Sequence, residues 1–134
     1  MTYNRTSPNI PVAQPVGLSP TGVWIQVAPE PDPFLAEPPS KIATSGVPLD
    51  DQPEIWARIG VTIDTSYAGD VFVSVFSSDS GTASIDDGQT FASATDGVAT
   101  FTNLIITADS FDSLVLAFTL ENGHSVNSDA IFIL

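Results

Sequence analysis

The chain has 134 residues, the length of a single domain, and its 3 Lys and Arg residues stand against 16 Asp and Glu residues, for a net charge of −13. Nucleic acids and membrane surfaces are anionic and would repel such a chain, so neither is an expected partner. The sequence has no cysteine, which excludes disulfides, cysteine-ligated zinc and thiol catalysis; its hydrophobic residues, 43% of the total, must provide the core instead.

The N-terminal part of the chain has its own composition. All eleven prolines lie in the first 53 residues. Because proline fixes φ and lacks an N–H, we expect this part to be extended rather than helical or central in a sheet. We divide it into an N-terminal arm over residues 1–21 and a proline-rich segment over residues 22–53, in which residues 23–28 alternate and offer a first strand. The compact core is expected over residues 54–134.

Within this core, alternation of apolar and polar residues predicts strands. Residues 55–64 alternate through ten positions, which indicates one long strand, and residues 71–76 alternate valine with phenylalanine or serine. Further strands are expected at residues 83–85, 90–94, 98–107, 113–120 and 130–134. Turn signals follow at Asp86-Asp87-Gly88, Asp96-Gly97 and Asn122-Gly123. No segment has a helical period, so the sequence predicts an all-β, antiparallel β-sandwich.

One stretch carries a family resemblance. Residues 96–106, DGVATFTNLII, combine an Asp-Gly turn, Ala99 and Phe101 two positions apart, and a second apolar strand. This pattern resembles bacterial and phage immunoglobulin-like domains of the filamin- or invasin-like kind, and it implies an immunoglobulin-like sandwich over residues 40–134 or, if a first strand joins it, over residues 22–134. A bulge near Asn103 would shift the phase of the alternation and keep Leu104 on the same core face as Phe101.

The resemblance has one departure. The family often has Gly-x-Tyr before its penultimate strand, where this chain has Ser110, Phe111 and Asp112. The local corner is therefore expected to differ, while the sandwich is not affected.

Chemistry is sparse in this sequence. The single histidine, His124, lies beside Ser125 in an expected loop, and without a G-x-S-x-G elbow it is interpreted as a loop residue. Asp79, Asp86 and Asp87 are interpreted as turn formers, with calcium binding by their carboxylates as the alternative. We therefore expect no enzyme activity, no cofactor and no metal site.

Partner binding is the more informative hypothesis. Apolar groups on an extended arm are common anchors on a partner, and this chain has six of them: Tyr3, Ile10, Val12, Val16, Leu18 and Trp24. Trp24 is equally compatible with a first strand of the sandwich.

The first residues show no apolar leader, so we expect synthesis in the host cytoplasm without a secretory signal. Together with the resemblance and the arm, this favours a structural virion protein: a bacteriophage capsid decoration (cement) protein on the capsid surface. Its partners would be the major capsid protein and copies of itself, with a homotrimer as the expected assembly. Two alternatives stay open: a tail- or fibre-associated adhesion module that binds host glycans, and a cell-surface adhesin domain.

Overall fold

A computed structural model describes residues 29–86 and 89–134. Within these residues the chain forms strands and no helix, which confirms the all-β class. Nothing in this part of the chain offers a helix long and apolar enough to cross a membrane. The twelve strands are β1 (Asp32–Glu37), β2 (Ile42–Ala43), β3 (Glu54–Ile59), β4 (Thr62–Ile63), β5 (Asp70–Ser78), β6 (Ser84–Ile85), β7 (Phe91–Ser93), β8 (Val98–Thr100), β9 (Ile106–Thr107), β10 (Ser113–Leu120), β11 (Ser125–Asn127) and β12 (Ile131–Ile133).

The first sheet is built around β3, which pairs antiparallel with β1, β4 and β8. Alternation along β3 buries Ile55 and Ala57 and leaves Trp56 and Arg58 half-buried on the other face. Phe34 on β1 is the register partner of Trp56, and their ring centroids are 5.7 Å apart. The Arg58 guanidinium lies 3.7 Å from the centre of the Phe34 ring, a cation–π contact that closes this outer face.

The second sheet has the order β2-β12-β10-β5-β7, with β11 also paired to β10. Its longest ladder is the antiparallel pairing of β10 with β5, which runs from Leu114 opposite Ser78 to Leu120 opposite Val71. The prediction of a purely antiparallel arrangement is wrong at one place, because β2 and β12 pair in parallel. A third, two-stranded sheet joins β6 to β9.

The two larger sheets share one hydrophobic core. Ile55 and Ala99 from the first sheet and Val71 and Leu116 from the second belong to the same buried cluster. At its centre the Phe101 and Phe118 rings, both fully buried, meet edge to face with centroids 5.6 Å apart. Since no disulfide is available, this burial is the main source of stability.

The predicted phase shift within residues 98–107 is confirmed, but the predicted bulge in one strand is wrong: β8 ends at Thr100 and β9 begins at Ile106, in different sheets. Four side chains of this segment have no measurable exposure: Ala99, Phe101, Leu104 and Ile106. The first two stand at odd positions and the last two at even positions, so the alternation changes phase between them. The shift falls on Thr102 and Asn103, whose backbone amides donate to Gln89 Oε1 at 2.8 and 3.0 Å. The side chain of a distant loop thus satisfies the backbone groups that the interrupted strand leaves unpaired.

The single strand predicted over residues 55–64 is wrong. The chain reverses after Ile59 and pairs β4 with β3. Gly60 makes the reversal with φ +63°, a left-handed conformation that glycine adopts without steric cost, and Val61 is 88% exposed at its tip.

The core also extends N-terminally of residue 54, where it was expected to start. β1 and β2 precede that position, and Leu49 and Pro53 are buried. Pro33 is tolerated within β1 because this strand lies at the edge of its sheet order, where a missing N–H leaves no partner unpaired. The arm over residues 1–21 and the alternating residues 23–28 lie outside the described residues.

Two of the predicted turns join other strands than expected. The turn at Asn122 and Gly123, closed by the Leu120 amide donating to the His124 carbonyl at 2.9 Å, connects β10 to β11 rather than to β12. The strands at residues 83–85 and 90–94 form no hairpin, since β6 pairs with β9 and β7 with β5. Asp96 and Gly97 do form the predicted turn, with φ +51° and +81°.

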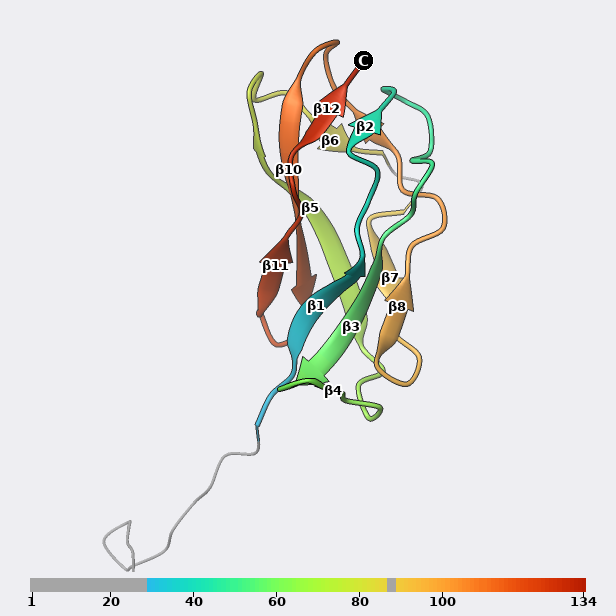
Figure 1. Cartoon of the computed structure of the whole chain (residues 1–134), viewed down its shortest axis with the longest axis vertical. Coiled ribbons are helices and arrows are strands. Elements are labelled where there is room, and N and C mark those ends of the chain that lie inside the picture. The colour runs from blue at the N-terminus through green and yellow to red at the C-terminus, as the bar shows by residue number, and fades with distance from the viewer. Residues whose placement is uncertain (1–28, 87–88) are drawn as a thin grey trace, which may run out of the picture.

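The described chain starts and ends at opposite ends of the molecule (Figure 1). It starts beside β4 and runs up into β1, while the C-terminus lies at the far end, beside β12 and β2. Whatever precedes residue 29 therefore joins the domain far from Leu134.

Candidate functional site

The six anchors proposed from the sequence lie outside the described residues: Tyr3, Ile10, Val12, Val16, Leu18 and Trp24. They remain a prediction. The described residues present a different candidate, an apolar surface on the second sheet.

This surface follows from the alternation along β5. Val71 and Val73 point into the core, so Phe72 points outward and is exposed. Its register partner on β7 is Phe91, also exposed, and the two ring centroids are 6.1 Å apart. Phe76 is exposed as well, at a β-bulge where β5 gains a residue opposite Val115 and Leu116.

A second aromatic pair lies on the same outer side, near the C-terminus. Phe132 on β12 is the register partner of Ser113, the outward-facing first residue of β10. Phe111 packs on it with a centroid distance of 6.3 Å and is 75% exposed. We call Phe72, Phe76, Phe91, Phe111 and Phe132 the aromatic face; it holds five of the eight phenylalanines of the sequence. Exposed aromatic side chains in this number point to a binding surface, because a solvated surface does not need them.

Phe111 is held in a strained conformation. Its φ is +68°, in the left-handed region that bulky residues rarely adopt, while its amide donates to the Ile133 carbonyl at 2.7 Å. Strain that the surrounding structure enforces is concentrated at functional sites. Here it places an aromatic ring in solvent.

The neighbouring carboxylate anchors this corner. Asp112 is buried, and its two oxygens accept hydrogen bonds from Ser80 Oγ at 2.7 Å and from the Ser80 amide at 3.1 Å. The hydrogen bond from the Ser80 hydroxyl lowers the pKa of Asp112 below its ordinary value and outweighs burial, which acts in the opposite direction. Asp112 directly follows Phe111, so its bonds to Ser80 tie this corner to the loop after β5.

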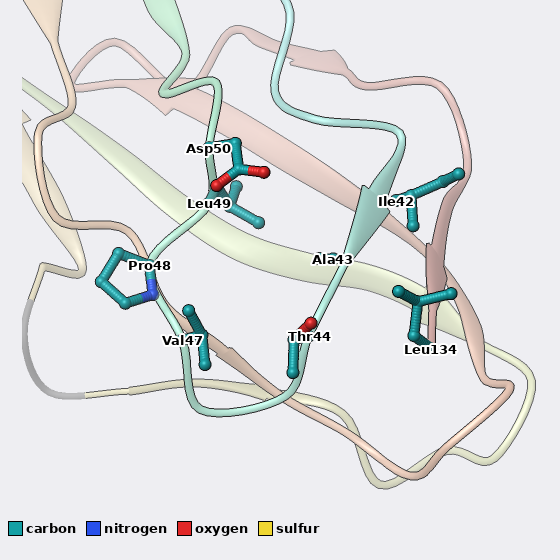
Figure 2. Close-up of a pocket in the computed structure, with 8 residues that line it drawn as sticks. All are labelled: Ile42, Ala43, Thr44, Val47, Pro48, Leu49, Asp50 and Leu134. Carbon is teal, nitrogen blue, oxygen red and sulfur yellow. The ribbon is translucent and has the colours of Figure 1, made fainter.

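Beside the aromatic pair lies a hollow of about 190 Å³, which apolar side chains border together with Thr44 and Asp50. Figure 2 shows Ile42 and Leu134 side by side on one wall and Val47 and Pro48 on the loop opposite. The floor includes the buried Leu49, and Asp50 contributes the one carboxylate side chain of the lining. Because Ile42 is the register partner of Phe132, the hollow continues the aromatic face around the β2 edge of the sheet.

The two chemical alternatives of the sequence fall elsewhere. His124 Nδ1 lies 2.7 Å from Asp32 Oδ1 and 3.1 Å from the Pro31 carbonyl oxygen, so the imidazole joins the β10–β11 turn to the start of β1. Asp79 and Asp86 lie in separate loops, where the Asp79 amide donates to the Ser113 carbonyl and Asp86 accepts from Thr107. Asp87 lies outside the described residues, among which no group of three His, Asp or Glu side chains could hold a metal ion.

The domain that carries the aromatic face is strongly acidic. Residues 30–134 carry all 16 acids and only two bases, Lys41 and Arg58. Arg58 stacks on Phe34 of the other sheet, and Lys41 lies 3.9 Å from Asp129 with both side chains largely exposed. Partners of the aromatic face must therefore tolerate or complement the negative charge of the domain.

The alternation along residues 71–76 predicted that the phenylalanines of β5 lie on the other face from the valines, but it did not identify them as a binding surface. The available signal was the alternation itself: large aromatic side chains occupy positions of residues 71–76 and 130–134 at which a solvated strand would carry polar residues. The sequence offers no such signal for Phe111, because this residue lies outside the strands and so belongs to no alternating pattern.

Comparison of the chain with family models, with curated proteins and with solved structures finds no match.

Proposed function

We propose that this chain is a structural virion protein, a phage capsid decoration or cement protein that binds the major capsid protein without performing chemistry. The observation that carries the proposal is the aromatic face. Clustered exposed apolar groups mark protein-binding surfaces, and aromatic residues supply most of the anchors in such interfaces.

The proposal includes an immunoglobulin-like β-sandwich. Strands β1, β3 and β8 belong to one sheet and β5, β10 and β12 to the other. This division corresponds to strands A, B and E against C, F and G of immunoglobulin domains. The strand order supports the resemblance that the sequence shows over residues 96–106.

In this proposal the domain lies on the capsid surface and the arm over residues 1–21 ties neighbouring subunits. A polyproline-like segment of that length spans on the order of 65 Å at ~3.1 Å per residue. The acidic surface would keep decorated particles apart in solution. Copies of the chain are the second partner, with a homotrimer as the expected assembly.

The first test is the copy number in particles purified from cells that carry the gene. A cement protein is present in a fixed ratio to the major capsid protein, which quantitative mass spectrometry measures. Absence from the particles would contradict the proposal. A few copies per particle, located at the tail and accompanied by glycan binding, would replace it with the adhesion-module alternative.

The second test is rebinding of the full chain to particles stripped of it. Replacing Phe72→Ser and Phe91→Ser together should weaken binding by roughly tenfold or more, since truncated aromatic anchors commonly cost about 2 kcal/mol or more. Val61→Ser is the control, because Val61 is an apolar residue that is even more exposed and lies in the β3–β4 turn of the other sheet. Equal binding by the double variant and the control would exclude the aromatic face as the contact.

A further inference from the structure

The hollow at the β2 edge is bordered by apolar side chains that the domain itself leaves in solvent. Ile42 is 58%, Val47 48% and Leu134 60% exposed, although they surround a floor that includes the buried Leu49. Three such groups converging on one concave site are costly in water and fit an apolar ligand that presents small branched side chains.

The direction of the chain at β1 determines which segments can reach this hollow. Pro29, Pro31 and Pro33 alternate with acidic residues, and proline restricts both itself and the residue before it to extended conformations. The Pro31 carbonyl is fixed to the domain by Asn122 Nδ2, which donates to it at 2.8 Å. In Figure 1 this segment leaves β1 beside β4, at the end opposite to β2 and the C-terminus. Residue 29, where the described chain starts, therefore lies at the end of the domain far from its own hollow.

The charge distribution also favours the N-terminal residues as the ligand of the hollow. Residues 1–29 contain one base, Arg5, and no acid, whereas residues 30–134 carry a net charge of −14. Two domains repel each other, but the N-terminal segment of one copy is attracted to the domain of another.

We propose that residues 10–18 of a second copy, IPVAQPVGL, dock in the hollow formed by Ile42, Val47, Pro48, Leu49 and Leu134. This segment presents Ile10, Val12, Val16 and Leu18 among prolines, and proline reduces the conformational entropy lost when a segment is fixed on a partner. The residues between Leu18 and Pro29 span on the order of 30 Å when extended, enough to reach an adjacent copy.

This contact is heterologous, because the segment of one copy meets the hollow of the next. It generates a ring where the rotation closes, such as a trimer, and an open chain of copies where it does not. The inference deepens the proposed function, since it names the site that joins copies. It is tested on the free protein, so particle binding and self-association can succeed or fail separately.

Cross-linking gives the direct test, because the sequence has no cysteine and each introduced thiol is unique. Full chains carrying Val12→Cys are mixed with full chains carrying Val47→Cys and treated with a short bismaleimide. A covalent dimer of the two chains is expected, identified by mass spectrometry of the linked peptides. Val61→Cys replaces Val47→Cys in the control, and its yield should be at least several-fold lower.

Complementation gives the second test. Val47→Asp and Val12→Asp should each abolish the rise of mass with concentration that sedimentation equilibrium detects for the unmodified chain. Mixing the two variants should restore dimers and nothing larger, because each retains one half of the contact. Both variants should unfold at the temperature of the unmodified chain.

Three outcomes would overturn the inference. The first is an unmodified chain that stays monomeric from micromolar to millimolar concentration. The second is self-association that survives Val47→Asp. The third concerns a chain that carries both Val12→Cys and Val47→Cys. If cross-linking occurs within this chain but not between the two mixed single variants, the segment docks on its own domain.

Discussion

His124 Nδ1 lies 2.7 Å from Asp32 Oδ1, and this contact joins the turn between β10 and β11 to the first residue of β1. Together with the bond from Asn122 to the Pro31 carbonyl, it determines where the N-terminal part of the chain leaves the domain. Both partners of the ion pair remain substantially exposed, so water screens their attraction.

We predict a small but measurable coupling between these two residues. A double-mutant cycle with His124→Ala and Asp32→Ala should give an interaction free energy of about 0.2–1 kcal/mol, the range of exposed ion pairs. Urea unfolding of the four proteins of the cycle measures it. The coupling should shrink in high salt, and its complete absence at low salt would show that the contact does not form in solution.

Asp112 should make the stability of the domain sensitive to acid. Its pKa is lowered in the folded state by the hydrogen bond from Ser80, so the folded state binds this proton less readily than the unfolded chain. The resulting stabilisation is fully present above the ordinary aspartate pKa and is lost as pH falls through the lowered value. Asp112→Asn should therefore destabilise the protein at neutral pH and reduce the acid dependence of its unfolding midpoint.

The control for that variant is Asp129→Asn, which removes an exposed carboxylate. This change should be close to neutral, since the repulsion that it relieves in so acidic a chain offsets the weak attraction to Lys41 that it removes. Equal losses in the two variants would mean that Ser80 contributes nothing to Asp112.

Gly97 should be the least replaceable glycine of the turns. Its φ is +81°, and a Cβ placed there would collide with the Asp64 carbonyl oxygen and with Ile63. Gly81 shares the left-handed conformation, with φ +74°, but has open space around it. Gly81→Ala should cost about 1–2 kcal/mol of unfolding free energy from backbone strain alone, and Gly97→Ala clearly more. Similar losses measured by chemical denaturation would contradict the close approach of Gly97 to β4.

We predict that the left-handed conformation of Phe111 does not stabilise the domain, as expected if it serves binding. Phe111→Gly removes an exposed ring and relieves about 1–2 kcal/mol of left-handed strain, against about 0.5–1 kcal/mol of added unfolded-state entropy. Thermal unfolding should therefore show an unchanged or slightly more stable protein. Phe101→Ala, at the buried ring contact, should instead lose about 3–5 kcal/mol. A loss of that size at Phe111 would mean that its ring supports the fold.

The sequence was informative wherever one face of a strand is buried over several residues. Residues 71–76 and 113–120 were predicted as strands because burial selects every second position, as Val71 and Leu116 show. The alternation failed at Gly60, because apolar residues continue at every second position through Val61 and Ile63 although the chain reverses there. Ile63 then pairs with Arg58 rather than extending the face of Ala57. It could not predict β2, since a two-residue strand has no period and its parallel partner, β12, lies almost ninety residues away.

The candidate site was less predictable than the fold. An exposed Phe72 is evident only once Val71 and Val73 are known to face the core, and the hollow brings together Ile42, Val47 and the last residue of the chain. Such a site depends on tertiary contacts that no local pattern encodes. The arm, by contrast, was predicted from proline content alone, and it lies with its anchors outside the described residues.

The parallel pairing of β2 with β12 also has a mechanical consequence. The described chain begins and ends at opposite ends of the molecule, so a tension applied between those ends pulls the two strands past each other along their length (Figure 1). The bonds from the Phe132 amide to the Lys41 carbonyl, at 2.8 Å, and from the Leu134 amide to the Ala43 carbonyl, at 3.0 Å, are then loaded together in shear. Antiparallel neighbours pulled from a shared end would instead open one bond at a time. A small domain joined in this way resists extension along its long axis, the direction in which a link between two anchored copies would be stretched.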